Sequence, residues 1–402
     1  MTIAKFLPYG RQTIEDDDIG AVVDALRGDF LTTGPKVDEF EDAFARATGA
    51  EHAIACNSGT AALHLAVLAE DIGPGDVAIV PTMTFLATAN VVRMTGAEVV
   101  FADVDGYTGL LTPDTFSEAC RRASAVGVKP KLALPVHLNG QICDMKELAR
   151  VAAANNIAMV TDACHALGSK NVGATDHSLS NCFSTHPVKA IATGEGGVVT
   201  TRDAERAARM RRLRSHGMNR ETAHFENHDL ASEAGLANPW YYEMQEFGWN
   251  YRMPDILCAL GISQLKKLER FWRRRREIAA LYDRLLAPLS PVVGQVPRGG
   301  AADGWHLYVV LIDFAALATT RAQFMDSLKR KSVGSQVHYV PVHRQPYYRH
   351  RYGALSLPGA DAYYARCLSL PFYPAMSDDD VHHVVDALTS LAVGLTGLRG
   401  LV

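Results

Sequence analysis

The sequence predicts an α/β protein with a mixed, mostly parallel sheet flanked by helices, followed by a smaller C-terminal α+β domain. Short apolar segments alternate with helical segments up to residue 201, an order typical of parallel sheets covered by helices on both faces. From about residue 253 the pattern becomes helical and then mixed. We therefore expect a large domain over residues 1–255, then a long connecting helix and a small domain over residues 256–402.

The elements of the large domain follow from local patterns. Residues 13–27 (TIEDDDIGAVVDALR) predict a helix, because its apolar residues from Ile19 to Leu26 share one face. Thr13 and Asp16 have the spacing of a capping box at its start. Strands are expected at AIACN (53–57), VAIVP (77–81), EVVFADV (98–104), KLALPVHL (131–138), IAMVTDA (157–163) and GGVVTT (196–201), with helices at TAALHLAVLA (60–69) and DMKELARVAAANN (144–156).

The C-terminal part begins with a long amphipathic pattern over residues 253–286, which predicts a helix with a glycine at position 261. Beyond it, strand and helix patterns are mixed, as in a small α+β domain. Strands are expected at WHLYVVLI (305–312) and SQVHYVP (335–341), and helices at RAQFMDSLKRK (321–331) and DDDVHHVVDALTSL (378–391).

Composition excludes several classes of protein. The net charge of the 402 residues is −4 with both signs interspersed, which gives no case for nucleic acid or a membrane as partner. The basic run 273–276 lies in a helical pattern and predicts a solvated helix face. Seven scattered cysteines without a CxxC motif indicate neither disulfides nor a metal site. Without a signal peptide or a spanning apolar run, we expect a cytoplasmic protein.

Two short segments carry groups that could bind a ligand. In CNSGTAALH (56–64) a strand ends, and Ser58, Gly59 and Thr60 open a helix. Free amides at a helix start favour an anion, although an ordinary capped helix has the same pattern. In VTDACHALGS (160–169), Asp162 ends an apolar strand. It either caps the next helix or, if buried, needs a partner such as a protonated ring nitrogen.

Lys189 stands in the segment FSTHPVKAIATGEGG (183–197), just before a glycine-rich turn. Burial lowers the pKa of an amine, and a neutral amine can form a Schiff base. Ser184, five residues earlier, could donate to the same anion as Thr60. A phosphate site, a carboxylate and a lysine in this order match pyridoxal 5'-phosphate, whose phosphate, ring nitrogen and aldehyde each need one of them.

The ordered motifs resemble those of the DegT/DnrJ/EryC1/StrS sugar aminotransferases, a branch of the fold-type I pyridoxal phosphate enzymes. The resemblance runs over essentially the whole chain, and so many ordered motifs are highly specific. They are FLTTGPKVDEFEDAF, NSGTAALHLA, PTMTFLATAN, TDACHALGS, FSTHPVKAIATGEGGVVTT, NYRMPDILCALGISQLKKLERF and CLSLPFYPAMSDDDV.

The resemblance implies a role for each matching residue. Lys189 would form the Schiff base with pyridoxal 5'-phosphate, with pyridoxamine 5'-phosphate as the intermediate form, and Asp162 would be the partner of the ring nitrogen. The other implied contacts are Phe85 on the cofactor ring, His165 at its phenolic oxygen, Gly59, Thr60 and Ser184 at its phosphate, and Asn250 at the phosphate from the neighbouring subunit. The last contact implies a homodimer with shared active sites.

Two positions depart from the family pattern. Cys164 stands where the family usually has a small alanine beneath the ring, and Thr185 replaces an aromatic residue of the usual FSFHPVK. Both side chains are modest in size. We therefore expect them to tune the surroundings of the cofactor without loss of activity.

Within the family, segments such as RSHGM and SQVHYVPVHRQPYY are most similar to the branch that aminates a UDP-linked 4-keto sugar in pseudaminic acid synthesis. This implies L-glutamate as amino donor and UDP-2-acetamido-2,6-dideoxy-β-L-arabino-hexos-4-ulose as the nucleotide-linked keto sugar. The residues that match substrate contacts there are Tyr9, Asp29, Phe30, Leu31, Thr32, Gln336, Val337, His338 and Tyr339. For His338 the alternative to a substrate contact is a purely structural role, as a histidine whose hydrogen bonds are satisfied between the two domains.

Three alternatives stay open at this stage. The first is another amino-sugar branch, such as GDP-perosamine or UDP-bacillosamine synthesis. The second is a pyridoxamine-dependent sugar dehydratase, but such relatives replace the lysine that this chain keeps at position 189. The third is a protein that binds the cofactor without catalysis, which the intact set of Lys189, Asp162 and the phosphate residues argues against.

Overall fold

The structure is a computed structural model that describes residues 5–170, 172–174, 177–297 and 305–396. Its centre is a seven-stranded sheet with the order β1 (His52–Cys56), β7 (Gly197–Thr201), β6 (Ser180–Ser184), β5 (Ala158–Asp162), β4 (Leu132–Ala133), β2 (Val77–Pro81) and β3 (Glu98–Ala102). β7 pairs antiparallel with both β1 and β6, whereas the other neighbours pair in parallel. The predicted mixed, mostly parallel sheet is confirmed.

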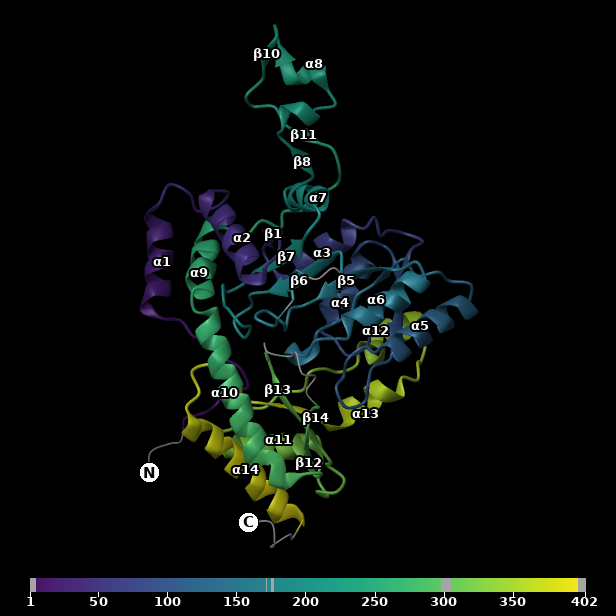
Figure 1. Ribbon diagram of the computed structural model, residues 1–402, viewed down its shortest axis with the longest axis vertical. Helices are drawn as coiled ribbons and strands as arrows, with labels where there is room; N and C mark the ends of the chain where they lie inside the picture. Colours follow the sequence, from purple (N-terminus) through teal and green to yellow (C-terminus); the bar gives the residue numbers. More distant parts are fainter. Residues whose placement is uncertain (1–4, 171, 175–176, 298–304, 397–402) are drawn as a thin grey trace.

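Helices lie on both faces of this sheet (Figure 1). α3 (Gly59–Leu68) packs with α4 (Leu86–Met94), and α5 (Pro113–Ala125) packs with α6 (Met145–Ala154). α7 (Ala204–Arg214) packs against β1, as does α2 (Pro35–Thr48). No helix within the described ranges is both long and apolar enough to cross a membrane.

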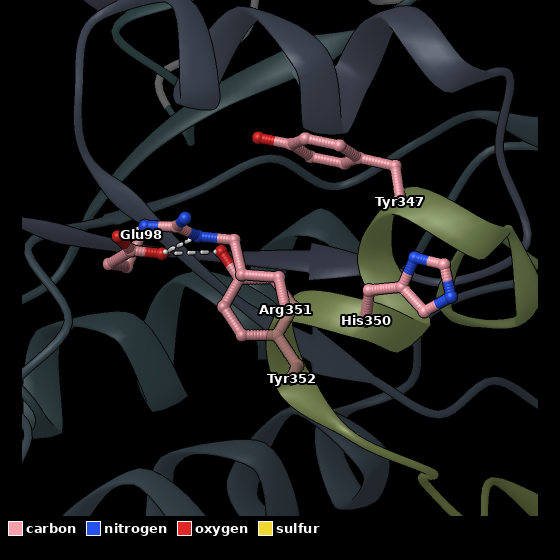
Figure 2. Close-up of a pocket in the computed structure, with 5 residues that line it drawn as sticks. All are labelled: Glu98, Tyr347, His350, Arg351 and Tyr352. Carbon is pink, nitrogen blue, oxygen red and sulfur yellow. Dashed lines mark hydrogen bonds and ion pairs between the residues drawn. The ribbon is translucent and has the colours of Figure 1, made fainter.

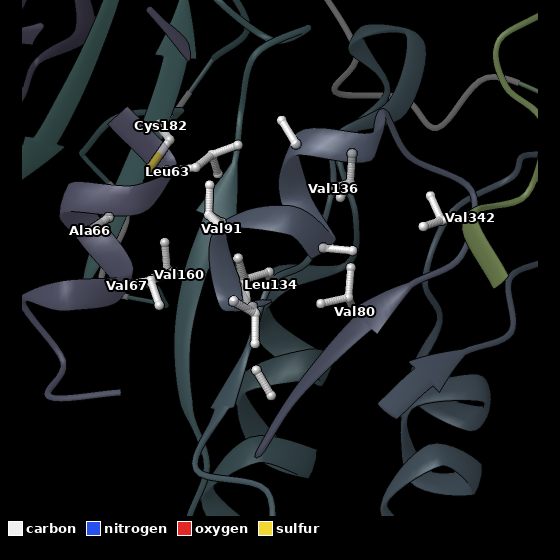
Figure 3. Close-up of a cluster of buried hydrophobic side chains, with 14 of the residues drawn as sticks. Leu63, Ala66, Val67, Val80, Val91, Leu134, Val136, Val160, Cys182 and Val342 are labelled. Carbon is white, nitrogen blue, oxygen red and sulfur yellow. The ribbon is translucent and has the colours of Figure 1, made fainter. Parts of the chain in front are cut away.

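The core between the sheet and the first helix pair is aliphatic (Figure 3). Val80 from β2 and Val160 from β5 are fully buried, as are Leu63 from α3 and Val91 from α4. Branched side chains pack well on a pleated surface and bury apolar area. The packed core therefore holds the residues at the carboxyl ends of the strands in fixed positions.

The small domain contains an antiparallel sheet with the order β12 (Val293–Gln295), β13 (Tyr308–Ile312) and β14 (Cys367–Leu370). The helices of the C-terminal part of the chain are α10 (Leu268–Leu286), α11 (Arg321–Arg330), α12 (Pro346–Tyr352), α13 (Pro358–Arg366) and α14 (Asp378–Thr396). Of these, α12 packs against Phe101 of β3 in the large sheet. The amino-terminal segment joins this domain, because the Leu7 carbonyl accepts a hydrogen bond from the Gly334 N–H at 2.7 Å. The division into residues 1–255 and 256–402 stays a prediction.

Several helix boundaries differ from the sequence-based expectations, and two of the differences change the number of helices or the residues that cap one. The pattern over residues 253–286 forms two helices, α9 (Asp255–Leu265) and α10, instead of one. At the amino terminus, α1 (Asp16–Arg27) begins after Glu15, whose N–H donates to the carboxylate of Asp18 at 2.9 Å. The cap is therefore made by Glu15 and Asp18, and not by Thr13 and Asp16.

Three further expectations are wrong. The strand expected at residues 131–138 is reduced to Leu132–Ala133, and Leu138 already belongs to a 3-10 helix. Residues 335–341 form no strand and make one isolated bridge, between Gln336 and Ser369. In the basic run of α10, Arg275 is buried and donates to the carbonyl groups of His306 and Phe372, both at 3.1 Å. This arginine bonds the carbonyls of two loop segments instead of facing water, so the run is not a purely solvated face.

Residues 218–247 form a segment that projects from the body of the protein, which we call the arm (Figure 1). It consists of β8 (Met218–Asn219), α8 (His228–Ala231), β9 (Ser232–Glu233), β10 (Leu236–Ala237) and β11 (Glu243–Met244), with β8 paired to β11 and β9 to β10. The exposed apolar side chains of the arm are Leu230, Leu236, Trp240, Tyr242, Met244 and Phe247. Short 3-10 helices lie at Leu138–Gly140, Thr222–His224, Ala287–Leu289 and Val342–Arg344.

Two glycines in helices should respond in opposite ways to replacement by alanine. A Cβ at Gly261 in α9 would lie 2.5 Å from a ring carbon of buried Phe40, so Gly261→Ala should destabilise by about 1–3 kcal/mol through overpacking. A Cβ at Gly20 in α1 meets no atom within 4 Å, so Gly20→Ala should stabilise by up to about 1 kcal/mol. Urea unfolding of both variants measures the difference, and a Gly261→Ala protein at least as stable as wild type would contradict the close packing.

Candidate active site

A cavity of about 640 Å³ opens where the parallel strands of the large sheet end, which is where ligands bind in such sheets. The large domain supplies residues that follow β1, β2, β5 and β6, and the small domain supplies the segment 336–339. The predicted residues that line this cavity are Tyr9, Gly59, Thr60, Phe85, Asp162, His165, Ser184, Lys189, Gln336, Val337, His338 and Tyr339.

The start of α3 forms one wall of the cavity. Ser58 caps the helix by accepting a hydrogen bond from the Ala61 N–H at 3.1 Å. The amides of the first turn lack acceptors within the helix, and the helix dipole adds positive potential there. A Cβ at Gly59 would lie 2.8 Å from the Cβ of Ser184. Glycine therefore lets the helix start and the end of β6 meet, which brings amides and a hydroxyl to one anion-binding corner.

Asp162 ends β5 on another side of the same cavity and is 5% exposed. One of its carboxylate oxygens accepts from the Thr88 hydroxyl at 2.7 Å, and the other accepts from the Cys164 N–H at 3.1 Å. The two donors come from α4 and from the turn after β5. They fix the orientation of the carboxylate, so that it can face a ligand.

Lys189 lies in the turn between β6 and β7, and its N–H donates to the His186 carbonyl at 2.8 Å. Burial lowers the pKa of the Lys189 amine below its usual value, and Cys164 and Asp162 nearby oppose that shift in part. A larger share of the amine is therefore neutral, and a neutral amine is the nucleophilic form.

Aromatic side chains and histidines enclose the rest of the cavity. The Phe85 ring is 56% exposed, and its centroid lies 5.8 Å from that of Tyr339. His338 shares a hydrogen bond of 2.7 Å with Ser369 of β14, and burial lowers its pKa to about 3, so it is neutral. His338 therefore anchors its segment to the small sheet and also lines the cavity.

Five predicted site residues lie outside the cavity of their own chain. Residues 29–32 are exposed, and the Leu31 carbonyl accepts from the Asp255 N–H at 3.0 Å. Asn250 is exposed at the base of the arm, and its carbonyl accepts from the Asn57 side chain at 3.3 Å. The structure of one chain thus leaves the side chains of these residues facing outward.

Two contributors to the site were not found from the sequence. Thr88, which holds Asp162, lies in the first turn of α4, and its hydroxyl also shares a hydrogen bond of 2.7 Å with that of Thr84. Nothing in the segment PTMTFLATAN indicates that Thr88 reaches the end of β5. His306 lines the cavity from the small domain, with its ring centroid 4.5 Å from that of His165. No motif around His306 signals this role, because it depends on how the domains pack.

A second hollow lies beside β3 and α12 and is lined by charged and aromatic side chains (Figure 2). Arg351 donates to Glu98 at 2.9 Å, and the Tyr352 hydroxyl donates to the same carboxylate at 2.7 Å. The hydrogen bonds from Arg351 hold the pKa of Glu98 at about 2. Because Arg351 and Tyr352 already occupy its oxygens, Glu98 is not free to act on a ligand in this hollow.

The groups around the first cavity fit pyridoxal 5'-phosphate. The start of α3 with Ser184 suits the phosphate, Asp162 suits a protonated ring nitrogen, and the amine of Lys189 suits the aldehyde. A side chain at position 59 would collide with Ser184, so the anion-binding corner requires the glycine at this position. This combination defines a pyridoxal phosphate-dependent transferase.

The family model of the DegT/DnrJ/EryC1/StrS aminotransferase family matches residues 12–389, and the chain belongs to this family. It is 38% identical over 396 residues to the spore coat polysaccharide biosynthesis protein SpsC of Bacillus subtilis, with 97% of this chain and 98% of SpsC covered. Helicobacter pylori PseC, an aminotransferase involved in the biosynthesis of pseudoaminic acid, superposes with a TM-score of 0.85 at 26% identity, covering 97% of this chain and all of PseC.

A second similar structure is Spr1654 of Streptococcus pneumoniae, whose PMP form has a TM-score of 0.86 at 27% identity, with 97% of this chain and 100% of that one covered. Spr1654 has also been solved in a PLP form. The protein is therefore a sugar aminotransferase of fold type I with pyridoxal phosphate as its cofactor, as its motifs predict.

The lowered pKa of Lys189 should be visible in the cofactor-free protein. Lys267 is a matched control, because burial would lower its pKa but ion pairs with Asp17 at 2.6 Å and Asp18 at 2.7 Å raise it. In competitive acetylation followed by mass spectrometry, Lys189 should reach half-maximal labelling at a lower pH than Lys267. Equal midpoints would show that burial does not depress the pKa of Lys189.

Proposed function

We propose that the protein transfers the amino group of L-glutamate to C4 of a nucleotide-linked 4-keto-6-deoxy sugar. The proposed substrate is UDP-2-acetamido-2,6-dideoxy-β-L-arabino-hexos-4-ulose, and the product is UDP-4-amino-4,6-dideoxy-N-acetyl-β-L-altrosamine. The observation that carries the reaction type is the partly buried Lys189, whose amine has a lowered pKa and which lines one cavity with Asp162 and the start of α3. The similarity to PseC over 97% of the chain supports the choice of sugar.

The cofactor would be held at three points. The amides of Gly59 and Thr60, with the hydroxyl of Ser184, would bind its phosphate, because they lie at a helix start where anions are stabilised. Asp162 would face the ring nitrogen with its orientation set by Thr88. Phe85, whose ring is more than half exposed, would cover one face of the cofactor ring.

When bound, pyridoxal phosphate supplies an electron sink for the bonds that are made and broken at the reacting carbon. Lys189 would take a proton from the α-carbon of L-glutamate in one half-reaction and give a proton to C4 of the sugar in the other. Its lowered pKa suits both tasks, because a group that titrates nearer to neutral pH gives and accepts protons more readily. Asp162 would keep the ring nitrogen protonated throughout.

The substrate residues divide into two groups. Tyr9 and residues 336–339 line the cavity of their own chain, and we place the sugar against them. Residues 29–32 and Asn250 face outward, so they would serve the cavity of a second copy. The nucleotide would add binding energy away from the reacting carbon and so help to position the sugar.

Exposed apolar surface supports a homodimer with shared sites. The arm carries six exposed apolar side chains, and on α1 the predicted apolar face leaves Ile19 and Leu26 each more than half exposed. Phe30 and Leu31, which follow α1, are exposed as well. Clustered apolar surface of this kind marks protein interfaces, and Asn250 lies at the base of the arm, where a partner would meet it.

A second candidate is an aminotransferase for another nucleotide-linked 4-keto sugar, of the GDP-perosamine or UDP-bacillosamine type. The higher identity to SpsC than to PseC, 38% against 26%, favours this alternative, because SpsC is described by its part in spore coat polysaccharide synthesis. Both candidates share the cofactor chemistry. They differ in the groups that contact the sugar and the nucleotide.

Incubation with 15N-labelled L-glutamate and a panel of nucleotide-linked 4-keto sugars tests the reaction. We expect the label on C4 of the UDP-linked 2-acetamido sugar, and a much slower reaction of the free sugar. Lys189→Ala is the control, and its turnover should fall at least about 100-fold. Label at C3, or loss of a hydroxyl without amination, would contradict the proposal, and preference for a GDP sugar would favour the second candidate.

Mixing two inactive proteins tests the shared site. Lys189→Ala removes the amine from a chain's own cavity, and Asn250→Ala removes the contact proposed to act in the partner's cavity. A mixed dimer would contain one site with both groups, so activity should return on mixing, up to about a quarter of the wild-type level if subunits pair at random. No recovery, with subunit exchange shown by differently tagged chains, would mean that Asn250 does not act across subunits.

A further inference from the structure

His165 and Tyr339 face each other across the domain boundary in the cavity. Nε2 of His165, in the turn after β5, lies 3.1 Å from the hydroxyl oxygen of Tyr339, in the segment before α12. Both residues line the cavity. A hydroxyl and an imidazole can each donate or accept, so the direction of this hydrogen bond depends on their other partners.

The backbone of Asn139 fixes the direction. Its N–H donates to Nδ1 of His165 at 3.2 Å, so Nδ1 carries no hydrogen. Burial, aided by the nearby charge of Lys189, lowers the pKa of His165 well below its usual value, so the ring is neutral with one hydrogen. That hydrogen must be on Nε2, and His165 therefore donates to the Tyr339 oxygen.

The hydrogen of the Tyr339 hydroxyl is then available to a ligand. Burial raises the pKa of Tyr339 well above its usual value, so the phenol keeps its proton. Within the described residues, the Tyr339 hydroxyl makes no other side-chain hydrogen bond than the one to His165. Because that bond uses the oxygen as acceptor, the O–H is left to donate into the cavity.

Asn139 is held in turn by the small domain. Its backbone has φ of 63°, and its carbonyl accepts from the N–H of His306 at 3.0 Å and of Leu307 at 3.2 Å. Its side chain donates to the Tyr363 hydroxyl at 2.9 Å. The packing of the two domains thus sets which nitrogen of His165 carries the hydrogen.

We propose that Tyr339, oriented by His165, donates its hydroxyl hydrogen to the phenolic oxygen of the bound cofactor. His165 is then a positioning residue that acts through Tyr339, instead of reaching that oxygen itself as its motif predicts. The proposal rests on the cofactor site of the proposed function. A hydrogen bond to this oxygen would stabilise its deprotonated form. The other titratable groups near this pair are Tyr9, Asp162, Cys164, Lys189, His306, His338 and Tyr363.

The pH titration of the visible absorption band of the cofactor-loaded protein, without substrate, tests the role of Tyr339. Tyr339→Phe should raise the midpoint by about 1–2 pH units, because the deprotonated phenolic oxygen of the cofactor, a charged acceptor, loses a hydrogen bond. Tyr348→Phe is the matched control, since it removes another buried tyrosine hydroxyl, bonded to Asn90 at 2.8 Å and outside the cavity. It should leave the midpoint unchanged.

A double-mutant cycle tests whether His165 acts through Tyr339. His165→Leu alone should raise the midpoint by less than Tyr339→Phe does, and in the Tyr339→Phe background it should have no further effect. An unchanged midpoint in Tyr339→Phe would overturn the proposal, as would a full effect of His165→Leu in the double variant.

A crystal structure of the loaded wild-type protein is an independent test that needs no variant. The Tyr339 oxygen, and not Nε2 of His165, should lie within hydrogen-bond distance of the phenolic oxygen. The reverse arrangement, or a Tyr339 that contacts only the keto oxygen of an added sugar, would overturn the proposal. Failure of the proposed function is distinct, because it would appear as a wild-type absorption band that L-glutamate does not change.

Discussion

The backbone of β7 passes so close to the start of α3 that a Cβ at Gly197 would lie 2.2 Å from the carbonyl oxygen of Ser58. No side chain fits there, so the two backbones meet directly. β7 also pairs with β6, and the turn between them carries Lys189. This single contact therefore sets how far the amine and the end of β6 lie from the free amides of α3. A displacement of β7 would separate groups that one cofactor must touch together.

Much of the fold could be predicted because burial has a direct sequence signal. β1, β2, β3, β5 and β7 are apolar and fall within a residue or two of the predicted ranges at most of their ends. β6 was missed because its sequence, SNCFS, begins with Ser180 and Asn181, which are buried polar residues in a central strand. Residues 335–341 show the opposite error, because their pattern is typical of a strand but they make only one isolated bridge, at Gln336, and residues 336–340 in a row line the cavity.

The residues of the site likewise include some that the sequence indicates and some that it does not. Lys189, Asp162 and the start of α3 follow β6, β5 and β1, which all run in the same direction, with only β7 between β1 and β6. The topology therefore brings the three to one edge of the sheet. The Thr88 hydroxyl and the His306 ring come from elements whose packing against that edge leaves no local pattern. The direction of the bond between His165 and Tyr339 depends on a backbone amide in another loop. Sequence could indicate which residues meet there, but not which of them gives the hydrogen.

The arm has a consequence for the newly made chain. Its six exposed apolar side chains are in contact with water until a binding partner covers them. Until then, this exposed apolar surface favours non-specific association. Pairing with a second copy would then compete with aggregation, and the outcome would depend on how soon two folded chains meet. Synthesis of neighbouring chains from one message would favour correct pairing, because it raises the local concentration of partners while each arm is still uncovered.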